Sequence, residues 1–127
     1  MIELTIREMI ESVSVLRGIN DKKMPARTAY QFARIIREVE NELRNFNVAR
    51  DKALERYGKK DSAGKLIEDE DGRVEIYPEK QSDFNKEISD LMESKIKINC
   101  EPIELDDIAD NEFTPNEIAD LFLFIRN

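Results

Sequence analysis

One stretch of this chain, residues 25–58, constrains the fold more than any other. Pro25 can open an α-helix and Gly58 can end it. Residues spaced alternately three and four apart form an apolar line between them, with one charged member: Ala29, Phe32, Ile36, Val39, Leu43, Phe46, Arg50, Ala53 and Tyr57. Such a helix would extend about 50 Å, whereas a compact domain of this size has a radius of gyration of about 14 Å. We therefore expect a long central helix whose apolar line is covered by other helices or by a second copy.

Arg50 is the odd member of this line, and two interpretations stay open. The residue can mark the point where the covering helices end, or it can pair with a buried acid and set the register of packing at a cost in stability. The first interpretation is favoured. Either way, Arg50 is a candidate partner-binding residue.

Length and composition favour a single domain, 1–127, in a reducing compartment. The chain has 127 residues and one cysteine, Cys100, which cannot form an internal disulfide and which we expect to be buried. No apolar run approaches the ~20 residues of a membrane span, and the N-terminus lacks the layout of a signal peptide. We expect a cytoplasmic protein that makes no membrane contact.

The charge is unevenly distributed along the chain. Residues 61–127 hold nineteen acidic and seven basic side chains, whereas residues 26–60 hold nine basic and five acidic ones. The acidic half disfavours contact with nucleic acid or anionic lipid. We therefore expect the basic stripe of the long helix to face acidic parts of this fold or of a partner, with no direct nucleic-acid binding.

Capping and turn residues place most of the remaining elements. A capping box of Thr5 and Glu8 starts a helix that we expect Gly18 to end in a left-handed conformation. Asp69-Glu70-Asp71-Gly72 separates two β-prone runs and predicts a hairpin over 66–77. Ser82 or Asp83 is expected to cap the next helix, which ends near Ser94.

Three further elements follow toward the C-terminus. Residues 95–100 alternate in hydrophobicity and predict a strand, and Asp106 is a candidate cap for a short turn through Ala109. Thr114, Pro115 and Glu117 then give the clearest helix start in the chain. The fold class expected is α+β, mainly helical: one long helix at about 25–57 packed by three shorter ones, with a small antiparallel β element that joins the hairpin 66–77 to the strand 95–100.

The terminal helix is expected to be apolar around most of its circumference. Ile118, Leu121, Phe122 and Ile125 have helical spacing, and Leu123 and Phe124 add further apolar side chains. Such a helix is buried in the core or in an oligomer interface. The candidate partner-binding residues are therefore Leu121, Phe122 and Phe124, together with Arg50 and the acidic turn Asp69, Glu70 and Asp71.

The residues that chemistry requires are mostly missing. The chain has no histidine, and its glycines match no phosphate-binding loop. The acidic turn fails as a calcium loop because, with Gly72 at the sixth position, Ile67 and Pro78 occupy the first and twelfth positions. Glu93-Ser94-Lys95 has nuclease-like spacing but lacks an upstream metal-binding aspartate. We expect no catalytic residue, no metal and no cofactor, and therefore no enzyme; phosphate capture by Lys23, Arg27 and Arg34 is a weaker alternative.

Several segments together resemble a group of small phage and prophage proteins of Gram-positive bacteria whose function is unassigned. The similarity runs from about residue 5 to the end, and the residues that carry it specify the fold rather than chemistry: Lys23-Met24-Pro25-Ala26-Arg27-Thr28-Ala29-Tyr30, Leu54-Glu55-Arg56-Tyr57-Gly58, Phe84-Asn85-Lys86-Glu87, Ile96 and Ile98, Glu101-Pro102-Ile103, and Phe113-Thr114-Pro115. The resemblance implies a viral or prophage origin. It supplies no catalytic residues.

Two functions are expected on this basis. The first is a non-enzymatic phage accessory protein that binds a phage or host protein, as a homo-oligomer. The alternative is an anti-defence inhibitor, in which the acidic surface of 61–127 occupies the basic nucleic-acid groove of a host nuclease.

Overall fold

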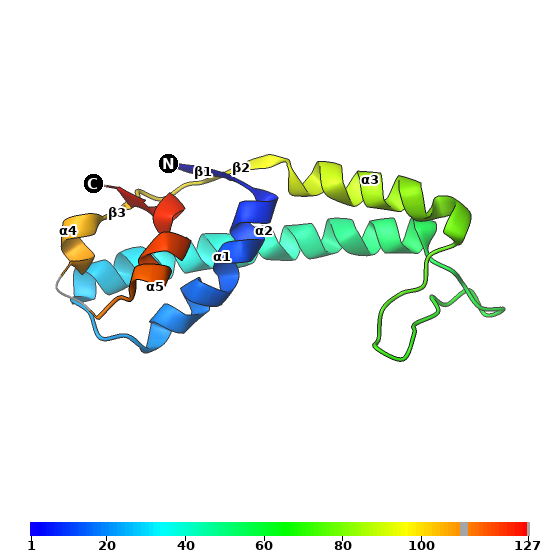
Figure 1. Cartoon of the computed structure of the whole chain (residues 1–127), viewed down its shortest axis with the longest axis horizontal. Helices are drawn as coiled ribbons and strands as arrows, with labels where there is room; N and C mark the ends of the chain where they lie inside the picture. Colours follow the sequence, from blue (N-terminus) through cyan, green and yellow to red (C-terminus); the bar gives the residue numbers. More distant parts are fainter. Residues whose placement is uncertain (110–111, 127) are drawn as a thin grey trace. The chain divides into compact units, whose positions relative to one another are not determined.

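The computed structural model describes residues 1–109 and 112–126 of the chain (Figure 1). Contacts divide it into two compact units, one of Met1–Leu43 with Ser94–Asn127 and one of Arg44–Glu93. The fold is α+β and mainly helical, as expected. Its elements, in order, are β1 (Ile2–Thr5), α1 (Ile6–Gly18), η1 (Ile19–Asp21), α2 (Ala26–Tyr57), η2 (Pro78–Lys80), α3 (Gln81–Met92), β2 (Lys95–Ile98), β3 (Ile103–Glu104), α4 (Leu105–Ile108), α5 (Pro115–Asp120), η3 (Phe122–Phe124) and β4 (Ile125–Arg126).

The long helix is confirmed as one uninterrupted element, α2. Pro25 precedes it and accepts a hydrogen bond at its carbonyl from the Ala29 amide at 2.9 Å. The buried positions form a heptad pattern, which shares four members with the apolar line drawn from the sequence: Thr28, Phe32, Ile35, Val39, Phe46 and Ala53. Two other members of that line are displaced by one residue, since Thr28 and Ile35 are buried rather than Ala29 and Ile36. Arg50 is exposed, and the residues on either side of it are not buried.

In the first unit, α1 begins as the capping signal indicates. The Thr5 hydroxyl accepts from the Glu8 amide at 3.1 Å, and the Glu8 carboxylate accepts from the Thr5 amide at 2.8 Å. The expected left-handed C-cap at Gly18 is wrong. Gly18 has right-handed angles, φ −65° and ψ −31°, because the chain continues from α1 into the 3₁₀ turn η1.

The strand predicted over 95–100 is confirmed for Lys95–Ile98, but its partner differs from the expected one. β2 pairs antiparallel with β1, with Ile2 opposite Ile98 and Leu4 opposite Ile96. The expected joining of this strand to the hairpin 66–77 is therefore wrong. The N-terminal residues alternate in hydrophobicity like the strand itself, and three of these four side chains, Ile2, Leu4 and Ile98, are buried.

The C-terminal region follows its predicted start but not its predicted length. The capping box of Thr114 and Glu117 opens α5, which ends at Asp120 and gives way to the 3₁₀ turn η3. Strand β4 then runs parallel to β3, with Ile103 opposite Ile125. The expected cap at Asp106 is also wrong, because Glu104 is the N-cap of α4 and makes no side-chain bond there.

The second unit contains a meander of extended segments between the end of α2 and α3. Backbone bonds join Lys59 to Glu75 and Ile67, so residues 58–60, 66–68 and 74–76 pair side by side. Two alike turns connect them, Asp61–Lys65 and Asp69–Arg73. In each, the aspartate carboxylate accepts two backbone N–H bonds at 2.8–3.0 Å, and the fourth residue is a glycine with φ near +79°.

The hairpin predicted over 66–77 is thus confirmed, and the first turn was not foreseen. The 3₁₀ turn η2 leads into α3, so the expected cap at Ser82 or Asp83 is wrong: Lys80 precedes the helix without a side-chain bond. Helix α3 lies along the end of α2, where the Arg56 guanidinium is 2.8 Å from the Glu87 carboxylate (Figure 1).

Candidate functional site

The three apolar site candidates near the C-terminus have opposite environments. Leu121 and Phe124 are 0% exposed, whereas Phe122 is 72% exposed. In a 3₁₀ turn, residues three apart align on one side, so Leu121 and Phe124 point into the core and Phe122 points outward. Leu121 and Phe124 are therefore core residues rather than partner contacts, and only Phe122 of the three is available to a partner.

The other candidates lie in the second unit and are all exposed. Arg50 is 3.5 Å from Asp51, whose side chain is largely in solvent, so the interpretation that it pairs with a buried acid is wrong. The Asp69 carboxylate holds its turn through the amides of Asp71 and Arg73.

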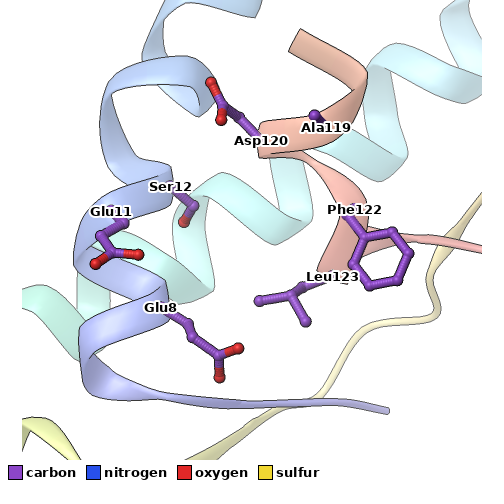
Figure 2. A pocket seen from close by; sticks show the side chains of 7 residues that line it. All are labelled: Glu8, Glu11, Ser12, Ala119, Asp120, Phe122 and Leu123. Carbon is purple, nitrogen blue, oxygen red and sulfur yellow. The ribbon is translucent and has the colours of Figure 1, made fainter. Parts of the chain in front are cut away.

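Phe122 instead borders a hollow of about 290 Å³ in the first unit, which we call the acidic hollow. Figure 2 shows its lining, three residues from α1 and four from the C-terminal segment: Glu8, Glu11, Ser12, Ala119, Asp120, Phe122 and Leu123. In this view the ring of Phe122 lies on the side away from α1, and Leu123 extends toward α1. The volume is at the lower end of the range for small-molecule pockets, which suits one or two side chains.

Three carboxylates and one buried hydroxyl supply the side-chain polarity of the acidic hollow. Ser12 is 4% exposed and donates its hydroxyl hydrogen to the Met9 carbonyl at 2.7 Å. Glu11 and Asp120 form no side-chain hydrogen bond or ion pair with any described residue. Within the described part of the chain, no three acidic or cysteine side chains stand close enough to hold a metal ion. The hollow is thus a negatively charged surface.

Lys22 fixes the C-terminal segment that carries half of this lining. Its ammonium donates to the Glu112 carbonyl at 2.5 Å and lies 3.2 Å from the Glu117 carboxylate. It also lies 5.2 Å from the ring centre of Phe113, which stacks on Phe32 at 6.2 Å. One lysine therefore ties the start of the segment to the linker before α2.

The lowered pKa of Glu117 indicates that the stability of this segment depends on pH. The hydrogen bond from the Thr114 amide, aided by Lys22, holds the pKa of the Glu117 carboxyl below its ordinary value of 4.5. Because the folded pKa is depressed, the stabilisation is present above pH 4.5 and is lost as the pH falls through the folded pKa. We expect amide protection at residues 115–124 to decline below that pH, measured by hydrogen exchange, with an NMR titration midpoint for Glu117 below 4.5.

Glu117→Gln is the matched control, because glutamine keeps the capping geometry without the charge. In this variant, amide protection at residues 115–124 should no longer decline over the pH range in which the Glu117 carboxyl titrates. A Glu117 midpoint at or above the ordinary value would contradict the expectation.

A second surface in the same unit surrounds Cys100. Two small hollows share Arg34, Cys100 and Glu101 in their lining. The cysteine is buried, as expected from the sequence, and burial raises the pKa of its thiol. Because the thiolate is the nucleophile of cysteine chemistry, this environment favours the inert form.

Comparison with known proteins gives no further guide to this site. No family model, no curated protein and no solved structure matches the chain. In the residues that the structure describes, no helix has the length and apolar character that a bilayer crossing requires.

Sequence reasoning missed most of the acidic hollow. Glu8 and Glu11 are spaced to share a side of α1, a signal that was available. Asp120 gave no signal, and Leu123 was expected only as part of the apolar terminal helix, because the placement of both residues depends on where α5 ends.

Proposed function

We propose that this protein acts by binding another protein, and that the acidic hollow is its contact surface. The observation that carries the proposal is Phe122, a phenylalanine 72% exposed beside a hollow, in the same turn as Leu121 and Phe124, which are fully buried. Phenylalanine is among the residues that are enriched in protein–protein interfaces relative to the rest of the surface.

The chemistry of the hollow supports binding over catalysis. The chain has no histidine to act as a base near neutral pH.

The biological setting comes from the resemblance to phage and prophage proteins. We propose a phage accessory role in a bacterial host, with a phage or host protein as the partner. Self-association is a further binding mode, but the apolar face of α2 does not demand it, because Phe32, Ile35 and Val39 are buried within one chain. The alternative of a nuclease inhibitor has little support from the acidic residues of the turns, because the carboxylates of Asp61 and Asp69 accept backbone hydrogen bonds within their own turns.

A site-specific crosslinking experiment tests the proposal. Phe122 is replaced by the photoreactive residue benzoylphenylalanine in a Gram-positive host, before and after prophage induction. Tyr30 provides the control position, an aromatic residue of the same unit that is 67% exposed but does not line the acidic hollow. We expect a discrete crosslinked protein from position 122 and not from position 30.

A crosslinked product that contains two copies of this chain would identify self-association as the binding event. The absence of a discrete product at position 122, with the protein expressed and folded, would overturn the proposal.

A further inference from the structure

We infer that the acidic hollow receives a segment of a partner protein in which an arginine stands next to an apolar residue. The inference rests on the proposed function and adds the chemistry of the partner. It follows from the hydrogen-bonding character of the hollow, its uncompensated charge and the apolar side chains at its rim.

The side chains that line the hollow offer hydrogen-bond acceptors and no donors. Glu8, Glu11 and Asp120 carry carboxylates, which only accept. Ser12 could have donated, but its hydroxyl hydrogen is already given to the Met9 carbonyl, so only its lone pairs remain. An occupant must therefore supply donors, and an arginine guanidinium supplies five and accepts none.

The charge of the hollow leads to the same class of occupant. The carboxylates of Glu11 and Asp120 have no cation beside them in the described part of the chain, and the bond from the Thr5 amide occupies only one oxygen of Glu8. The chain as a whole carries a net charge of −8. Two copies would repel each other, whereas a basic segment is attracted. The occupant is thus a segment of a different protein.

Apolar side chains adjoin these acceptors. Phe122 is exposed, and Leu123 and Ala119 continue the lining. The face of an aromatic ring attracts a guanidinium, and the ring also packs against an aliphatic neighbour. A segment that combines an arginine with an apolar residue therefore satisfies both halves of the hollow.

Short peptide probes test this inference on the whole chain. The probe is the capped tripeptide leucyl-arginyl-leucine amide, titrated into ¹⁵N-labelled protein at low salt. The matched peptide contains citrulline, which keeps the shape of arginine but has no charge. Agmatine, the amine that carries the arginine headgroup without a peptide, is a third probe. We expect saturable shifts for the arginine peptide at Glu11, Ser12, Asp120 and Phe122, and binding at least tenfold weaker for the other two.

Charge-neutral variants localise the effect. Glu11→Gln and Asp120→Asn should each weaken binding of the arginine peptide about three- to fivefold, as expected for exposed ion pairs. Asp106→Asn removes an equal charge from an exposed side chain outside the hollow and should change the affinity less than twofold. Amide spectra of the free variants confirm that each one is folded.

Several outcomes would overturn the inference. These are equal binding of the citrulline peptide, equal binding of agmatine, an equal effect of Asp106→Asn, or no saturable shift around the hollow. If one of these outcomes is observed together with a crosslinked partner at position 122, the proposed function stands. Only the inference that the partner supplies an arginine is then overturned.

Discussion

Replacement of Phe124 by alanine is expected to lower the free energy of unfolding by about 3–5 kcal/mol. The ring has no exposed surface, so its removal loses apolar burial and leaves a cavity that the surrounding core fills only in part. Urea unfolding followed by circular dichroism measures the change. A loss of this size is a large fraction of the stability of a small domain.

Phe122→Ala is the matched control for this experiment. The same change two residues earlier should alter the free energy of unfolding by less than about 0.5 kcal/mol, because the Phe122 ring is mostly in solvent. If residues 115–125 formed a continuous α-helix, Phe122 would lie on the same face as Ile118 and Ile125 and would cost far more. Equal losses for the two variants would therefore contradict the 3₁₀ turn and the exposed rim of the acidic hollow.

Local signals in the sequence predicted the elements whose ends are fixed by neighbouring residues. Both capping boxes, Thr5 with Glu8 and Thr114 with Glu117, form the expected reciprocal bonds. The Asp69–Gly72 turn works in the same way, since the aspartate side chain and the positive φ of the glycine are properties of the turn itself. The length of α2 could be predicted because no breaker interrupts it.

Features that depend on tertiary packing could not be predicted in the same way. The end of α5 at Asp120 lets β4 pair with β3, a contact between residues far apart in the sequence. The buried pattern of α2 is displaced to Thr28 and Ile35 because the neighbours that cover the helix, and not its own hydrophobicity, select the buried face. The C-terminal residues that line the acidic hollow take their positions from the end of α5 at Asp120. Most of them could therefore not be predicted as lining residues from the sequence.

The turn from Asp61 to Lys65 was not predicted from the sequence, and the reason is a different one. Asp61 to Lys65 repeats the arrangement of Asp69 to Arg73, yet only the second turn was recognised. The first is preceded by Lys59 and Lys60, which do not resemble a strand. Its strand character comes from pairing with Ile67 and Glu75.

The second large effect is expected at Gly58, where α2 meets the meander. A Cβ atom at this position would stand 2.5 Å from the Leu54 carbonyl oxygen, 2.7 Å from the Leu66 side chain and 3.0 Å from the Val74 side chain. The oxygen cannot move away freely, because it accepts the Gly58 amide at 2.8 Å. The cost is steric and not conformational, since the positive-φ glycines are Gly64 and Gly72.

Gly58→Ala should therefore destabilise the second unit by about 2–3 kcal/mol through overpacking, detected as faster amide exchange across residues 44–93. Gly18→Ala is the control, because Gly18 has helical angles and nothing within 4 Å of an added Cβ. That variant should instead gain about 0.5–1 kcal/mol from reduced freedom of the unfolded chain. Because the same chemical change then has opposite signs at two helix ends, wild-type exchange in Gly58→Ala would show that the meander does not pack on the end of α2 as described.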